Sequence, residues 1–207
     1  METLNKKIIM TMVLLVSTIF SQAQTAETMQ SAFLNSYVNE SKANYSAAIT
    51  DIEKVYQTES YESNLRLGWL NFKSKKYAES MSYYQKAINL RKFSVEARLG
   101  FIAPSDASKQ FDKSFQKYLE ILEIDPYHKT ANYWVGVSYY TIKKYDLAQK
   151  YFQLLVNMYP FDYDCIHMLG WTYLNSGNFN DAKVLFQKAL LYNPSDASSK
   201  EGLSKCK

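Results

Sequence analysis

The 207-residue chain contains few of the residues that build catalytic or metal sites. It has two cysteines, two histidines, six glycines and four prolines. Two cysteines are too few for a disulfide scaffold, so Cys165 and Cys206 form either one disulfide or two free thiols, and we favour free thiols. His128 and His167 are far apart in the sequence, and only His167 lies near a cysteine. The sequence therefore predicts no structural zinc site.

No catalytic pattern is visible either. The chain lacks a nucleophile–histidine–acid set, a glycine-rich phosphate loop and a metal-ligand cluster. The one acid near His167 is Asp164, and a surface pair on one helix explains that spacing. We expect a non-enzymatic protein without a cofactor.

The excess of positive charge is small. The net charge is +4, and several lysines fall where turns between helices are predicted: Lys73, Lys75, Lys76, Lys143 and Lys144. Nucleic-acid-binding domains usually carry a stronger basic stripe, so we interpret these lysines as solvated turn residues and predict no nucleic-acid partner.

Long hydrophobic runs are absent except near the start. Lys6 and Lys7 precede an apolar run at residues 8–20, and Ser21 and Ala23 frame a cleavage site after residue 23. This layout is typical of a secretory signal peptide, and the run is shorter than the ~20 residues that span a bilayer. An uncleaved anchor or a buried helix is the alternative. We predict a signal peptide at residues 1–23, no membrane span after its removal, and export to a bacterial periplasm or to the outside of the cell.

A period of 34 residues organises the rest of the chain. Residues 163–196 read as a helix, a turn at residues 176–178 and a second helix that ends at Pro194. The segment 129–162 repeats this pattern in five matched pairs: Gly136 with Gly170, Tyr139 with Tyr173, Ala148 with Ala182, Phe152 with Phe186, and Pro160 with Pro194. A fixed period of this size indicates a stacked array of repeats.

These residues resemble the tetratricopeptide repeat family. The resemblance implies an all-α, right-handed α-solenoid of stacked antiparallel helix pairs that acts as an interaction scaffold. We divide residues 24–207 into a degenerate repeat at 29–60, repeats at 61–94, 95–128, 129–162 and 163–196, and a capping helix at 197–207. In the third repeat, Leu99 and Gly100 come two residues early and Pro104 disfavours helix, so we expect a short first helix and a protruding loop at residues 103–108.

Two aromatic columns follow the period on the second helices. One column is expected to fill the space between adjacent repeats: Tyr84, Tyr118, Phe152 and Phe186. The other is expected to begin each second helix: Tyr77, Phe111, Tyr145 and Phe179.

In this family the first helices line a concave binding face, and the resemblance places the candidate site there. The candidate partner-binding residues are Arg66, Trp69, Phe72, Arg98, Phe101, Tyr133, Tyr140, His167 and Trp171. Trp69, Tyr133 and Trp171 look surplus to the core, and exposed aromatic residues often mark interaction sites. The lysine–asparagine set with which some members grip a peptide carboxylate is missing, so that activity is not carried over. We expect a protein or peptide partner; binding of envelope glycan by the same aromatics, or self-assembly through repeat ends, is the alternative.

Overall fold

The computed structural model describes residues 27–207, in which every regular element is an α-helix. The predicted signal peptide lies outside the described residues. Residues 27–41 are helical. The helices that follow are α2 (Tyr45–Glu53), α3 (Tyr61–Lys73), α4 (Tyr77–Leu90), α5 (Val95–Ala107), α6 (Phe111–Ile124), α7 (Lys129–Thr141), α8 (Tyr145–Met158), α9 (Tyr163–Asn175), α10 (Phe179–Tyr192) and α11 (Ala197–Lys205). Within residues 27–207, no helix combines the length and the apolar character needed to cross a bilayer.

From α3 to α10 the helices keep the 34-residue spacing. First helices of 13 residues begin at Tyr61, Val95, Lys129 and Tyr163 and alternate with second helices of 14 residues. The predicted aromatic column begins each second helix. The fold class is confirmed as an all-α solenoid of stacked helix pairs.

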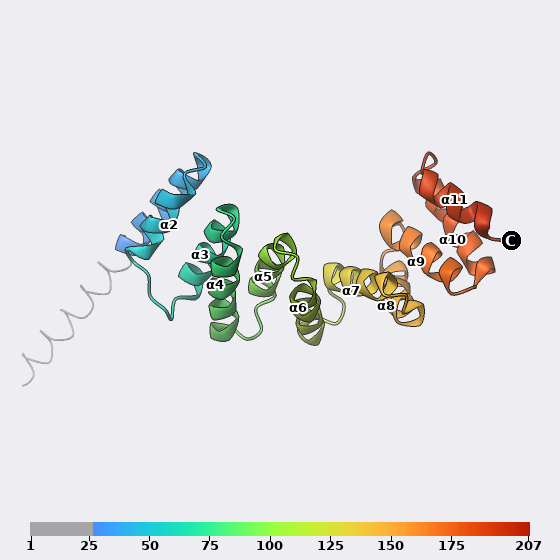
Figure 1. Ribbon diagram of the computed structural model, residues 1–207, viewed down its shortest axis with the longest axis horizontal. Helices are drawn as coiled ribbons and strands as arrows, with labels where there is room; N and C mark the ends of the chain where they lie inside the picture. Colours follow the sequence, from blue (N-terminus) through green and yellow to red (C-terminus); the bar gives the residue numbers. More distant parts are fainter. Residues whose placement is uncertain (1–26) are drawn as a thin grey trace, which may run out of the picture. The chain divides into compact units, whose positions relative to one another are not determined.

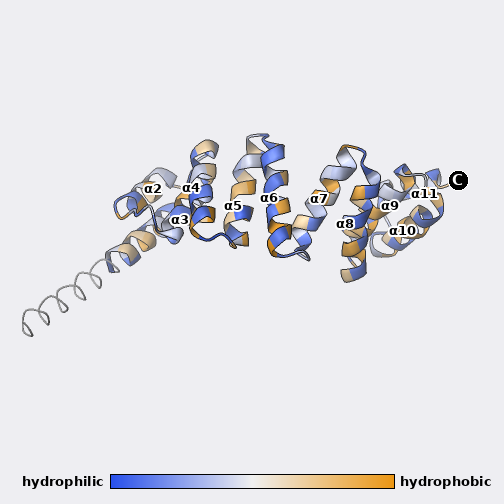
Figure 2. Cartoon of the chain, turned by 90° about the horizontal axis from the view of Figure 1, so that it is seen from below, coloured by the Kyte–Doolittle hydropathy of each residue, from blue (hydrophilic) through white to orange (hydrophobic). Residues whose placement is uncertain are grey.

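The described chain forms two compact units, one ending at Ser108 and the other spanning Lys109–Lys207. In the first unit α3 packs between α2 and α4, and α5 packs on both α3 and α4 (Figure 1). In the second unit the helices from α6 to α11 pack in sequence, and α9 also contacts α7 and α11. Hydrophobic and hydrophilic residues alternate around these helices (Figure 2), as expected where one side of each helix is buried.

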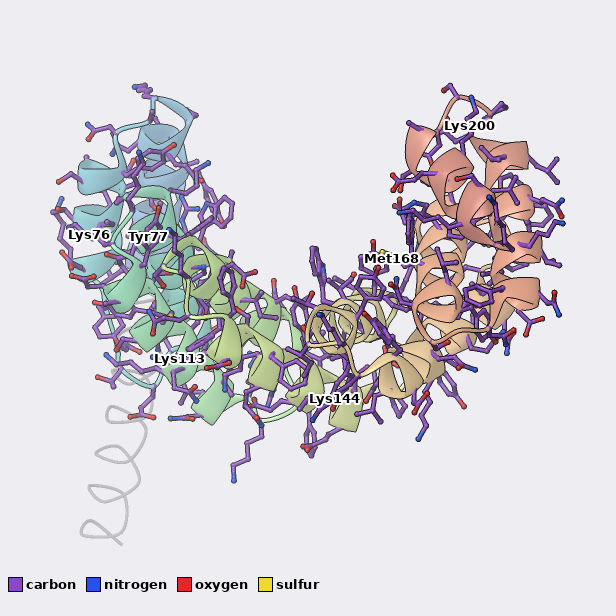
Figure 3. All side chains as sticks on the ribbon, turned by 45° about the vertical axis from the view of Figure 1, so that its right-hand side comes forward. Lys76, Tyr77, Lys113, Lys144, Met168 and Lys200 are labelled. Atoms are coloured by element: carbon purple, nitrogen blue, oxygen red, sulfur yellow. The ribbon has the colours of Figure 1, made fainter. Side chains whose placement is uncertain are left out.

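The turns inside the helix pairs have a common geometry. After α3 the N–H of Lys75 donates to the carbonyl of Phe72, and the N–H of Lys76 donates to Asn71, which is a Schellman motif. The motif needs a left-handed residue, and the φ of Lys75 is 62°. Lysine or alanine takes this strained position in every such turn except the last, where the chain has Gly177. Figure 3 labels Lys76 beside Tyr77 at the start of α4, and Lys144 just before α8.

Glycines let the buried aromatic rings fit between neighbouring helices. A Cβ on Gly68 of α3 would lie 2.9 Å from the Tyr84 ring, and one on Gly100 of α5 would lie 2.2 Å from the same ring. Tyr84 is therefore held between the first helix of its own pair and that of the next pair. Phe186 sits in the same way between Gly170 and Gly202, which confirms that this column fills the space between repeats.

The prediction for the third repeat is wrong. Helix α5 continues through Pro104 to Ala107, so no loop protrudes at residues 103–108. Proline in a helix interior costs about 3 kcal/mol. Burial of Phe101 and Ile102 offsets that cost, since each such side chain contributes about 1.5–3 kcal/mol. The serine at position 108 then ends the helix by donating its hydroxyl to the carbonyl of Pro104 at 2.7 Å.

The last helix, α11, forms as predicted, with the side chain of Asp196 accepting from the N–H of Ser199. Ser199 itself is fully buried. Both cysteines are free thiols, with Cys165 buried in α9 and Cys206 partly buried after α11.

Candidate binding surface

In the second unit, α7 and α9 lie side by side and are joined across one face. The side-chain amide of Asn175 on α9 donates to the hydroxyl of Tyr140 on α7 at 3.0 Å. Tyr140 also meets Tyr145 edge-on, with ring centroids 5.6 Å apart. Both tyrosines are partly exposed. Burial raises the pKa of Tyr140, so the hydroxyl stays protonated and available as a hydrogen-bonding group at neutral pH.

Nearer the start of α7, two aromatic rings are in contact with each other. Tyr133 and Trp134 are 5.6 Å apart and nearly perpendicular. Tyr133 is half-buried and its ring also meets the edge of Phe152 at 5.9 Å, whereas Trp134 is 45% exposed. Trp134 is therefore the most accessible aromatic side chain on this helix.

A polar cluster joins α9 to α11. The indole N–H of Trp171 points to both Nε2 of His167 and the hydroxyl oxygen of Ser198, each at 3.1 Å. The same Nε2 is 2.9 Å from the Ser198 hydroxyl. Nε2 can accept from Trp171 only in the neutral tautomer with its hydrogen on Nδ1, whereas the Ser198 hydroxyl can accept from Trp171 in either tautomer. Burial lowers the pKa of His167, against the opposing influence of Asp196, whose carboxylate is 3.9 Å away.

Trp171 also contributes to the core. Its ring meets Phe186 at 5.3 Å, edge to face, and it packs on the cluster around Leu174 and Phe186. Tyr133 packs in the same manner on the cluster around Phe152. The prediction that both are surplus to the core is therefore wrong. Each ring has a structural side and a partly exposed side.

The first unit places Arg66 and Trp69 around one carboxylate. Arg66 is 6% exposed, and its Nη1 donates to Glu40 while its Nε donates to the hydroxyl of Ser36 at 3.0 Å. Trp69 donates its indole N–H to the other oxygen of Glu40. Burial acts to raise the pKa of Glu40, but the hydrogen bonds from Trp69 and Arg66 lower it overall. The charge of Arg66 is thus already compensated within the chain.

Phe72 continues this aromatic group. Trp69 is 40% exposed and its ring lies 6.0 Å from Phe72, while the ammonium of Lys73 is 5.3 Å from the Trp69 ring. Trp69 and Phe72 form a small accessible aromatic patch on α3.

Arg98 and Phe101 lie away from the accessible face of α5. Arg98 is 8% exposed and donates to the carbonyl of Ser94 at 2.9 Å. Asn64 and Asn132, at the same place in their repeats, donate to the carbonyl four residues earlier in the same way. Phe101 is expected in the binding face but is 7% exposed and belongs to the core cluster around Tyr84.

The sequence reasoning missed Glu40, Asn175, Asp196 and Ser198. The sequence did contain one usable pattern, because pairs of polar residues that interact recur at a spacing of 33 residues. The Tyr61 hydroxyl is 2.7 Å from the Ser94 hydroxyl, and the Lys129 ammonium pairs with Asp162. Tyr163 hydrogen-bonds Asp196 at the same spacing. Each of these interactions joins the first residue of one first helix to the N-cap residue of the following first helix. In residues 27–207 no three potential ligands gather to hold a metal ion.

Comparison with known proteins gives consistent matches. Family models described as Tetratricopeptide repeat match residues 61–93, 130–162 and 163–196. A tetratricopeptide repeat protein from Parabacteroides merdae has a similar structure, with a TM-score of 0.73 and 16% identity, covering 87% of this chain and 72% of that one. The structure of MamA gives a TM-score of 0.69 at 18% identity, covering 83% and 95%.

A curated protein also matches in sequence. It is anaphase-promoting complex subunit 6 of Arabidopsis thaliana, 26% identical over 121 residues, which make up 58% of this chain and 22% of that protein. The match spans about a fifth of that relative's length.

Proposed function

Because the chain belongs to the tetratricopeptide repeat family, whose repeats form protein-interaction scaffolds, we propose that it holds a peptide segment of a protein partner against α7 and α9. The protein is a scaffold and its own side chains carry out no reaction. The same face would be used for an extended segment or for one helix of a partner.

The observation that carries this proposal is the half-buried state of one row of aromatic side chains. Tyr133, Tyr140 and Trp171 are each partly exposed, and Trp134 is 45% exposed. The remaining side of α7 and α9 holds the fully or almost fully buried residues Ala131, Val135, Cys165, Ile166 and Leu169. These buried residues supply much of the packing between repeats, while the aromatic row keeps a partly exposed side.

The chemistry of the row indicates the kind of segment that it would bind. Its polar groups are the hydroxyl of Tyr140 and the amide of Asn175, which are neutral and can bond to a peptide backbone. The rings offer apolar area for side-chain anchors, and aromatic residues carry much of the binding energy at such interfaces. A segment with apolar anchors therefore fits this face better than a strongly charged one.

A peptide selection tests the proposal. Peptides from a random display library are selected on the purified protein, and their affinities are measured for the parent and for two variants. Trp134→Ala removes an accessible ring from α7, and Phe179→Ala removes a ring of similar exposure (43%) from the start of α10. We expect Trp134→Ala to weaken binding by about tenfold or more and Phe179→Ala to leave it unchanged.

Equal affinities for the parent and Trp134→Ala would show that α7 is not part of the binding face. A library that yields no binder, together with sedimentation of the protein with cell-wall material, would favour glycan as the ligand instead. Circular dichroism of each variant provides the folding control.

We also propose that the protein is exported. The support is the basic, apolar and small-residue order of residues 1–23. Sequencing the N-terminus of the protein recovered from its host tests this directly. We expect the chain to begin at Gln24, and a protein that retains Lys6 and Lys7 would contradict it.

A further inference from the structure

The first helix of each pair turns one side toward the second helix of the pair before it. Gly100 on α5 lies against Tyr84 on α4, and Gly202 on α11 lies against Phe186 on α10. On α3 the corresponding side carries Leu70, which is fully buried against the cluster that α2 supplies. This side is where consecutive repeats stack.

The helix at residues 27–41 can be aligned with α3 by the turn that follows it. Ala43 has a φ of 56° and Lys75 a φ of 62°, and the Schellman hydrogen bonds of the two turns are offset by the same 32 residues. The second helices α2 and α4 also begin 32 residues apart. This offset places Leu34 and Val38 at the positions of Arg66 and Leu70.

No described repeat therefore covers the stacking side of the helix at 27–41, and this side is apolar. Leu34 is 64% exposed and Val38 is 44% exposed, while Tyr37 beside them is 55% exposed. Terminal repeats of a solenoid normally end in a polar surface. The last helix fits that rule, since α11 exposes Lys200, Glu201 and Lys205.

We propose that a second copy of the chain docks on this stacking side, so that two helices at 27–41 pack against each other about a two-fold axis. In a two-fold dimer the same patch meets itself, which penalises charge at its centre. The centre of this stripe is uncharged, with Ser31, Leu34, Asn35 and Val38 in sequence. The charged α11 would not suit the same apolar stripe, so a head-to-tail filament is disfavoured.

The charges at the ends of the stripe favour an antiparallel pairing. Glu27 precedes the apolar residues of the stripe and Lys42 follows them, and both are exposed. An axis that passes between Leu34 and Asn35 brings Glu27 of each copy opposite Lys42 of the other, with Ser31 opposite Val38. Opposite charges meet at both ends, and the apolar residues meet at the centre.

The test is the molar mass of the protein purified from its host, measured by sedimentation equilibrium. We expect a reversible dimer. Leu34→Glu places two like charges near the axis, so the molar mass should fall by half. Leu191→Glu is the control, because Leu191 is 77% exposed on α10 and its substitution should leave the dimer intact.

A cysteine at the axis tests the symmetry. In a Cys206→Ser background, Asn35→Cys should give a covalent dimer on mild oxidation, because the two introduced thiols lie close to each other across the axis. A parent protein that is monomeric throughout the concentration range would overturn the proposal. So would a dimer that survives Leu34→Glu, or one in which Asn35→Cys fails to crosslink. These outcomes concern the helix at 27–41 and leave peptide binding on α7 and α9 untouched.

Discussion

Replacing Gly202 with alanine tests how the last helix stacks on the repeat before it. Alanine is favoured over glycine in a helix interior by about 1 kcal/mol, so a helix without neighbours would gain stability. Here the new Cβ would lie 2.3 Å, 2.5 Å and 2.6 Å from three atoms of the Phe186 ring. Alanine at this position must therefore displace the ring or the helix.

The ring has little room to move. Phe186 is fully buried, and Gly170 lies against it from α9, where an added Cβ would already be 3.1 Å away. Overpacking of this kind typically costs about 1–3 kcal/mol. After the helix-propensity gain, we expect Gly202→Ala to destabilise the docking of α11 by up to about 2 kcal/mol.

A double-mutant cycle with Phe186→Leu separates the two contributions. The smaller side chain removes the clash, so in that background Gly202→Ala should stabilise the helix by about 1 kcal/mol. Hydrogen exchange of residues 197–205, followed by mass spectrometry, measures the opening of α11, since a terminal helix of a repeat array can open by itself. If Gly202→Ala alone, with Phe186 in place, slows exchange by as much as the helix-propensity gain of about 1 kcal/mol predicts, the close contact with Phe186 would be refuted.

Three further predictions concern acid, turns and thiol reactivity. Burial lowers the pKa of His167, so the folded chain takes up that proton less readily than the unfolded chain. The contribution of His167 to the free energy of unfolding should be complete above about pH 6.5, the pKa in the unfolded chain, and should be lost as the pH falls from there to the lowered pKa of the folded chain. His167→Gln should reduce that loss in urea titrations at several pH values. Lys143 has a φ of 59°, so Lys143→Gly should raise the free energy of unfolding by about 1 kcal/mol. Gly177 has a φ of 86°, so Gly177→Ala should lower the free energy of unfolding by a similar amount. Thermal unfolding measures both changes, and the opposite signs would contradict the turn geometry. Burial raises the pKa of Cys165 to about 12, so iodoacetamide should label it in urea and leave it unmodified in the native protein, as mass spectrometry would show.

The period of the sequence was enough to locate the helices. Each repeat must bury one side of its helices on the next, so residues such as Ala148 and Phe152 recur wherever that contact recurs. The misassigned third repeat has a specific cause. Glycine occupies two different places in these repeats, facing the ring of its own pair at Gly68 and that of the preceding pair at Gly100. Sequence alone does not distinguish the two contacts, although both need the missing Cβ.

The candidate site was less predictable. Spacing on one helix placed Tyr140, His167 and Trp171 correctly on first helices, but it gave no information on what each side chain touches in the next helix. The partners Asn175 and Ser198 are 35 and 31 residues away from the groups that they bond. Such contacts depend on the offset between stacked helices, which the sequence does not reveal directly.

The most direct test of the proposed binding face is photo-crosslinking from defined positions in living cells. A photoreactive residue replaces Val137, which is partly exposed on α7, or Val184, which is 61% exposed on α10. We expect a discrete adduct with another protein from position 137 and none from position 184. An adduct only from position 184, or the same adduct from both positions, would contradict binding along the first helices.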